Sequence, residues 1–149
     1  MGTQNIKHLK HSVGQNSYHL IWKPKWAKDP FKFVPLRNLC TAALRKAANR
    51  HGMTILELEV MPDHVHCFVE IPPSMSVSTT LQLLKGYSSY ALMKYHPWLR
   101  RHFRTGHFWS PGSFFRSVGN VTADAIRHYI AESNRGARTQ TSLKRYPGL

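Results

Sequence analysis

Acidic residues are scarce in this chain of 149 residues. Asp and Glu together number 7, against 21 Lys and Arg, and the formal net charge at pH 7 is +14 with the histidines counted as neutral. Because so little of the positive charge is compensated, polyanions concentrate near the surface and bind in a salt-sensitive manner. The charge therefore favours nucleic acid as the partner. A general effect on solubility and an affinity for acidic membranes are the alternatives.

Cysteines and long apolar runs are also few. Cys40 and Cys67, the two cysteines, lie in apolar patterns and form no short-spaced pair, so we predict reduced core residues rather than a disulfide framework or a cysteine metal site. No apolar run approaches the length of a membrane span, and the N-terminus lacks the apolar stretch of a signal peptide. Together these features predict a cytoplasmic protein without a membrane partner.

The spacing of apolar residues predicts one folded domain over residues 17–134, between a flexible basic N-terminal arm (1–16) and a basic C-terminal tail (135–149). In order, the predicted elements are a strand at 17–22, a helix from Leu36 to Gly52, strands at 54–61 and 64–71, and a helix from Val77 that His96-Pro97 ends. A final strand follows, made of Phe108-Trp109 and then 114–118 with an interruption around Pro111-Gly112, and the last element is a helix at 122–133.

The order of these elements predicts an α+β fold of the ferredoxin-like type, a split βαβ domain. Its antiparallel sheet would carry helices on one face and leave the other open, and Leu56, Leu58 and Val60 would face the helices. The inward stripe of the second helix is predicted to run from Val77 to Tyr95. RNA-binding modules of the RRM type share this layout, so the fold alone does not select a chemistry.

His64 and His66 are two positions apart in the strand predicted at 64–71. Since side chains alternate along a strand, both imidazoles would leave the open face, while Val65 and Cys67 face the core. Two neutral imidazoles side by side can chelate a divalent metal, and a metal beside a basic surface suggests phosphate chemistry. Histidines that merely cap or solvate the sheet are the alternative.

Tyr129 is predicted at the edge of the apolar stripe of the last helix, flanked by Ile126 and Ile130. A tyrosine in such a place is commonly an amphipathic boundary residue. Beside a metal, however, a phenol is a competent nucleophile.

Five segments, in this order and spacing, resemble the single-tyrosine HUH transposases: Met61-Pro62-Asp63-His64-Val65-His66, Lys85-Gly86-Tyr87-Ser88, Phe108-Trp109-Ser110, Ser117-Val118-Gly119-Asn120 and His128-Tyr129-Ile130. These are small transposases of bacterial and archaeal insertion sequences, with REP-associated relatives. The resemblance extends from about Tyr18 to Ser133.

The resemblance implies that His64 and His66 bind Mg²⁺ or Mn²⁺ and that Tyr129 attacks a phosphodiester of single-stranded DNA at the hairpin ends of a mobile element. The expected product is a 5′-phosphotyrosine linkage and a free 3′-hydroxyl. The resemblance also implies a homodimer whose active sites are composite, with the tyrosine helix of one subunit serving the histidine pair of the other.

The chain departs from the family where relatives commonly place a third ligand, a glutamine one helical turn after the tyrosine. Ser133 stands at that place. Glu132 is the strongest substitute because it is an anionic oxygen donor beside the tyrosine, and Asn134 and water are alternatives. A degenerate copy that binds DNA but cuts slowly also remains an alternative.

Lys85, Arg104 and Arg116 are the predicted DNA-binding cations, with Trp109, Phe114 or Tyr87 available to stack on unpaired bases. The alternative for most of these aromatic residues is a place in the core. Two rival functions remain open. One is a basic module that holds RNA or single-stranded DNA without chemistry, and the other is a metal-dependent nuclease that uses water.

Overall fold

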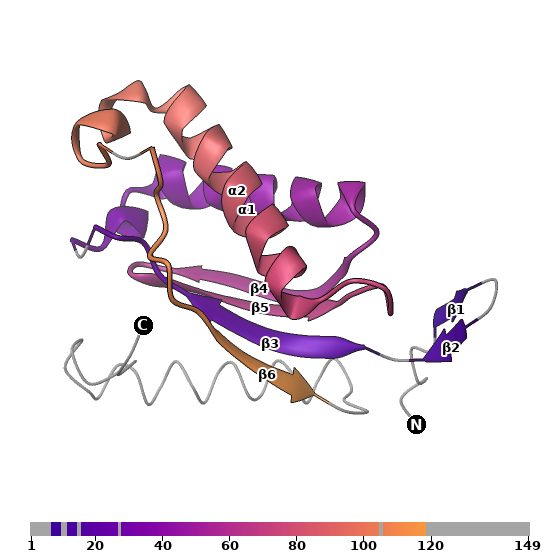
Figure 1. The fold of residues 1–149 in the computed structure, drawn as a ribbon. Helices are drawn as coiled ribbons and strands as arrows, with labels where there is room; N and C mark the ends of the chain where they lie inside the picture. The colour runs from indigo at the N-terminus through magenta and orange to yellow at the C-terminus, as the bar shows by residue number, and fades with distance from the viewer. Residues whose placement is uncertain (1–6, 10–11, 15, 27, 105, 119–149) are drawn as a thin grey trace.

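The body of the structure is a sheet covered on one face by two helices (Figure 1). It is a computed structural model that describes residues 7–9, 12–14, 16–26, 28–104 and 106–118. Its elements are, in chain order, β1 (Lys7–Leu9), β2 (Ser12–Gly14), β3 (Ser17–Trp22), the 3-10 helix η1 (Pro30–Lys32), α1 (Val34–Arg50), β4 (Thr54–Met61), β5 (His64–Glu70), α2 (Val77–Tyr95), the 3-10 helix η2 (Pro97–Arg101) and β6 (Phe114–Val118).

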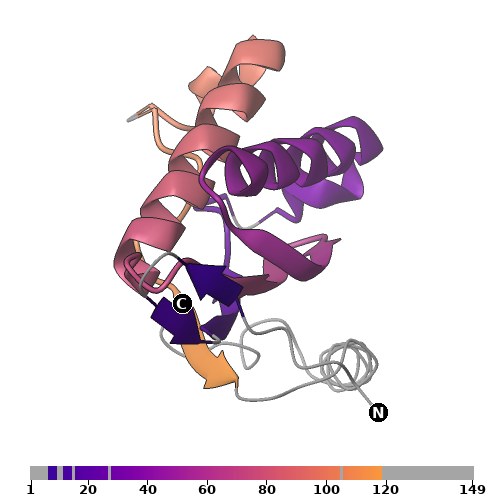
Figure 2. The same cartoon turned by 90° about the vertical axis from the view of Figure 1, so that its right-hand side faces the viewer.

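The main sheet has the strand order β4-β5-β3-β6, and every neighbouring pair is antiparallel. Figure 2 shows α1 and α2 on the same side of this sheet. This arrangement confirms the predicted α+β, ferredoxin-like fold. The helix predicted to carry Tyr129, the Gly119-Asn120 step and the tail at 135–149 lie outside the described residues.

Local sequence accounts for the ends of the helices. Pro35 occupies the first turn of α1, where its missing N–H costs nothing, and Gly52 follows the helix with a positive φ of 70°. Ser76 caps α2 because its hydroxyl accepts a hydrogen bond from the Thr79 amide at 3.0 Å. No helix among the described residues combines the length and apolarity that a membrane span requires.

The strand β4 joins β5 through the tight Pro62-Asp63 turn, and Met61 pairs with His64 as the predicted hairpin requires. A second hairpin, β1 with β2, lies within residues 7–14, where the sequence predicts no strand. Its three-residue strands are too short to give a periodic signal.

A bulge in β4 overturns one prediction about facing. The register of β4 against β5 shifts between Ile55 and Glu57, so Leu56 packs against Phe68 on the face away from the helices, whereas Leu58 and Val60 face the core as predicted. An extra residue in one strand changes the alternation, and this change cannot be read from the alternation itself.

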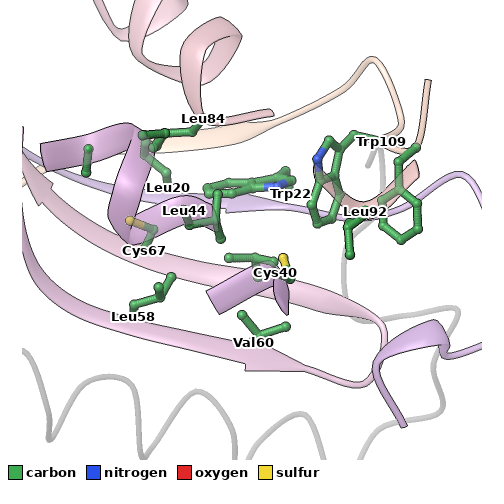
Figure 3. Close-up of a cluster of buried hydrophobic side chains, with 14 of the residues drawn as sticks. Leu20, Trp22, Cys40, Leu44, Leu58, Val60, Cys67, Leu84, Leu92 and Trp109 are labelled. Carbon is green, nitrogen blue, oxygen red and sulfur yellow. The ribbon is translucent and has the colours of Figure 1, made fainter. Parts of the chain in front are cut away.

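The core fills the space between the sheet and the helices, and Figure 3 shows part of it. Cys40 and Cys67 are buried there as unpaired thiols, which confirms the prediction for both. Burial raises the pKa of Cys67 to about 12, so its reactive thiolate is suppressed. The prediction that Tyr95 belongs to the inward stripe is wrong: Tyr95, the last residue of α2, is 64% exposed, whereas Met93 is buried.

Trp109 belongs to the core rather than to a DNA-facing strand. It is buried, pairs with Pro24 in an isolated bridge, and donates its indole N–H to Ser88 Oγ at 2.9 Å. Base stacking on Trp109 is therefore excluded. The same Ser88 hydroxyl donates to the Leu84 carbonyl at 2.7 Å, so one side chain links α2 to the segment that leads into β6.

Ser88→Ala is expected to lower the free energy of unfolding by about 1–3 kcal/mol, because it leaves the buried indole N–H of Trp109 without its acceptor. Urea unfolding followed by tryptophan fluorescence measures the change. Ser78→Ala, on the exposed side of the same helix, is the control and should change stability by less than about 0.5 kcal/mol. Equal losses in the two variants would contradict the assigned role of Ser88.

Candidate active site

The imidazoles of His64 and His66 lie together on the sheet face opposite the helices. Their ring centroids are 4.7 Å apart with the planes at 76°. The predicted sharing of one face is confirmed, but the prediction that this face is open is wrong: each histidine is only 1% exposed, and every residue of β5 is buried. Part of the cover comes from neighbouring strands, since Leu56 and Val118 pack on Phe68.

Asp63, in the turn before β5, orients the first histidine. Its Oδ1 lies 2.7 Å from His64 Nδ1. An ionised carboxylate can only accept, so the hydrogen is on Nδ1 of His64. In the neutral ring the lone pair is then on Nε2. This carboxylate–imidazole arrangement is the usual support of a metal-binding histidine.

His19, in β3, contacts the second histidine and was missed by the sequence analysis. Its Nε2 lies 3.0 Å from His66 Nδ1, and its ring stacks on Phe68 with centroids 4.2 Å apart and planes within 5°. It is 1% exposed. Alternation along 17–22 could have assigned His19 to the sheet face that Leu20 and Trp22 do not share. Its contact with His66, 47 residues further along the chain, depends on the register of β3 against β5 and could not be predicted from that pattern.

The site keeps two of its imidazoles neutral. Burial, and then the charge of Arg116, lowers the pKa of His19 to about 4. Burial, followed by the charges of His64 and His19, lowers the pKa of His66 to about 3 against the opposing effect of Asp63. Both rings are therefore neutral at pH 7, which is the form that binds metal ions.

Arg116 is the one predicted DNA-binding cation that lies at this site. It is exposed on the edge strand β6 and pairs directly with His19 across the sheet. A phosphate approaching the histidines from the β6 side would meet its guanidinium, which can bind two phosphate oxygens at once.

The donor set fits a divalent cation in part. Two neutral imidazoles from one strand face suit Mn²⁺ or a similar borderline cation. The described residues contain no group of three or more His, Cys, Asp and Glu able to hold a metal, so the remaining ligands would have to come from elsewhere. Tyr129, Glu132, Ser133 and Asn134 lie outside the described residues.

A basic groove lies along α2 and the segment that follows it. Its cations are Lys25, Lys85, Lys94, Arg100 and Arg104, and none of the described residues that line it is acidic. Two of the predicted DNA-binding residues, Lys85 and Arg104, therefore share this groove, whereas Arg116 lies on the other face of the sheet.

Lys85 also has a structural role. Its ammonium donates to the Ser110 carbonyl at 2.8 Å and to Ser113 Oγ at 3.2 Å, and burial lowers its pKa. It thereby fixes the segment before β6 against α2. Tyr87 is half-buried outside the groove, with the charged ends of Lys46 and Arg50 about its ring, while Phe114 is exposed.

The fold and the site define an α+β protein of the ferredoxin-like type, with a buried histidine pair on the sheet face opposite the helices and a basic groove on its helical side. Comparison with known proteins agrees with this class. The family model described as "Transposase IS200 like" matches residues 12–133. The chain belongs to this family, which confirms the resemblance found in the motifs.

Relatives match over most of the chain. It is 36% identical to the transposase for insertion sequence element IS200 of Salmonella typhimurium, over 95% of this chain and 93% of the relative. It is 30% identical to the ISDra2 transposase TnpA of Deinococcus radiodurans, over 79% of this chain and 84% of the relative.

Two solved structures have the same fold. One is the crystal structure of a protein from Deinococcus radiodurans R1 described as a transposase, with a TM-score of 0.69 and 28% identity over 85% of this chain and 96% of that one. The other is a REP-associated tyrosine transposase bound to a REP hairpin, with a TM-score of 0.58 and 12% identity over 95% of this chain and 80% of that one.

Proposed function

We propose that this IS200-like transposase cleaves and rejoins single-stranded DNA at the ends of a mobile element through a 5′-phosphotyrosine intermediate. The observation that carries the proposal is the buried pair His64 and His66, each with Nδ1 in a hydrogen bond to a neighbouring side chain. A pair that only capped or solvated the sheet would need neither burial nor these fixed orientations.

His64 and His66 are the residues that would hold a divalent cation, Mn²⁺ or Mg²⁺, with Glu132 proposed as a further ligand. When bound beside DNA, the cation would neutralise charge on the phosphate and polarise the ester. Nitrogen ligands favour Mn²⁺ over Mg²⁺. Asp63 keeps His64 in the tautomer that coordination requires.

Tyr129 is the proposed nucleophile. Its phenol oxygen forms the new bond to phosphorus, the bond from phosphorus to the 3′-oxygen breaks, the phenol gives up its proton, and the departing 3′-oxygen takes one up. The phosphotyrosine keeps the energy of the broken ester, so a later attack by another 3′-hydroxyl reseals the strand without a nucleotide cofactor.

The proposed DNA path runs from the basic groove to the histidine pair around the edge strand β6. Phe115 lines the groove, while Arg116, the next residue, lies opposite His19 on the other face. A strand held along α2 therefore needs only to pass this edge to reach the site. The hairpin bound by the REP-associated relative supports a folded DNA end as the ligand.

A denaturing gel tests the function. The full chain is incubated with Mn²⁺ and an oligonucleotide that carries the end of the element, and a covalent protein–DNA band is expected. A module that only binds would give a shift in native gels alone. A nuclease that uses water would cut the strand without that band. Either of these two outcomes overturns the proposal.

Replacing Arg100 and Arg104 together by Ala is expected to weaken binding of a hairpin oligonucleotide about tenfold, because phosphate contacts in the groove are lost. The slope of log affinity against log salt concentration should become shallower by about 1 to 2 for the same reason. Fluorescence anisotropy at several salt concentrations measures both quantities.

The control removes the same charge elsewhere. Lys46→Ala with Arg50→Ala takes two exposed cations from α1, outside the groove. It should change affinity much less than the groove variant. Equal effects of the two double variants would mean that net charge, not the groove, determines binding.

A further inference from the structure

The contact between His19 and His66 determines which nitrogen of His66 carries a hydrogen. A neutral imidazole has one N–H and one lone pair, and the two nitrogens that meet here, His19 Nε2 and His66 Nδ1, are 3.0 Å apart. One of them must donate to the other. If His66 donates, its lone pair is on Nε2. If His19 donates, Nε2 of His66 carries the hydrogen and cannot bind a metal.

We propose that His19 is a positioning residue that accepts the hydrogen bond from His66 Nδ1 and so fixes Nε2 of His66 as the metal-binding nitrogen. The inference rests on the proposed function, because it assigns the way in which this site is prepared for its cation. His19 then does for His66 what Asp63 does for His64. Each histidine is supported through Nδ1, one by a carboxylate from the turn and the other by an imidazole from the neighbouring strand.

The surroundings of His19 suit a fixed acceptor. Its ring stacks on Phe68 at a centroid distance of 4.2 Å with 5° between planes, and it lies within 14° of the plane of the His66 ring, with those two centroids 5.3 Å apart. Phe68 stands directly opposite His19 in the register of β3 and β5, and Leu56 and Val118 pack on Phe68 in turn. The ring therefore has little freedom to rotate away from His66.

Burial makes this partner difficult to replace. His19 and His66 are each 1% exposed, so bulk water cannot readily take the place of the imidazole acceptor. An aromatic carbocycle at position 19 would keep the stacking on Phe68 and lose the acceptor. An amide would keep an acceptor and lose the stacking. These two changes separate the hydrogen bond from the packing.

The first experiment reads the tautomer directly. Long-range ¹H–¹⁵N correlation spectra of the metal-free, ¹⁵N-labelled wild-type protein give the protonation of each ring nitrogen, and His66→Gln identifies the signals of His66. We expect hydrogen on Nδ1 of His66. Hydrogen on Nε2 would overturn the proposal, whatever the variants do. In His19→Phe the preference for Nδ1–H is expected to be lost.

The second experiment measures Mn²⁺ affinity by calorimetry in the absence of DNA. His19→Phe is expected to bind about 10–100-fold more weakly than the wild type, and His19→Gln to recover part of the loss. The matched control is His51→Phe, at the exposed residue that follows α1, and it should bind as the wild type does. Wild-type affinity in His19→Phe would overturn the positioning role.

The outcomes separate the inference from the function. If the wild type shows no Mn²⁺ binding that depends on His64 and His66, the proposed metal site fails. If that binding is present and indifferent to His19, only the present inference fails. Circular dichroism checks that each variant folds. Should His19→Phe not fold, the wild-type tautomer and the affinity of His19→Gln decide the question.

Discussion

Tyr129→Phe is expected to abolish the covalent protein–DNA product, with a decrease of at least about a thousandfold, while DNA affinity stays within about twofold of the wild type. A phenyl ring has the same shape as the phenol and lacks the oxygen that must bond to phosphorus. The assay is the denaturing gel with labelled end oligonucleotide and Mn²⁺, and anisotropy measures the affinity.

The control for this result is another tyrosine. Tyr95→Phe removes a hydroxyl that is exposed at the end of α2, and it should leave the covalent product unchanged. Strand cleavage that persists in Tyr129→Phe without any adduct would identify water as the nucleophile. A persistent adduct would show that a different side chain attacks the phosphate.

The fold could be predicted because its elements carry strong local signals. The strands predicted at 17–22 and 54–61 have the same bounds as β3 and β4, and Gly52 and Pro97 mark the ends of helices. The failures have local causes as well. One extra residue in β4 reverses the facing of Leu56, and the helical stripe was extended one residue too far, to Tyr95.

The site was predictable only where its residues are close in sequence. His64 and His66 share a face because they are two positions apart in one strand. His19 reaches His66 from a strand 47 residues away, and Arg116 reaches His19 from another. Those neighbours follow from strand order and register. The burial of the histidine face is likewise a tertiary property that the pattern of β5 alone does not give.

Lys85 and Trp109 show why residue type alone overstates binding surfaces. By residue type both are candidates for DNA contact, yet the Lys85 ammonium donates to Ser110 and Ser113, and the Trp109 indole lies in the core. Whether a lysine or tryptophan in a basic protein stabilises the fold or contacts DNA depends on the hydrogen bonds that its side chain already makes. Arg116 differs from the groove cations because it stands opposite His19 in the register of β3 and β6, on the histidine face of the sheet.

Substitution of both His64 and His66 by Asn is expected to remove the tightest Mn²⁺ binding and to lower formation of the covalent product by about a thousandfold. Metal stabilisation of the charge in the transition state is worth several kcal/mol, and each 1.36 kcal/mol corresponds to about a factor of ten in rate. DNA affinity should change little because the groove cations are untouched. Calorimetry, the denaturing gel and anisotropy measure the three quantities. His96→Asn with His51→Asn, two histidines outside the site, is the matched control.

Mixing this double variant with Tyr129→Phe tests whether the histidine pair and the tyrosine of one active site come from different subunits. If the protein is a homodimer with composite sites, a mixed dimer contains one complete site, made of the histidines of one subunit and the tyrosine of the other. The mixture is then expected to recover up to about a quarter of the wild-type product, because half of the dimers are mixed and each has one of two sites intact. Recovery requires that subunits exchange, so the variants are refolded together. If co-refolded subunits gave no product, the tyrosine would act on the histidine pair of its own chain.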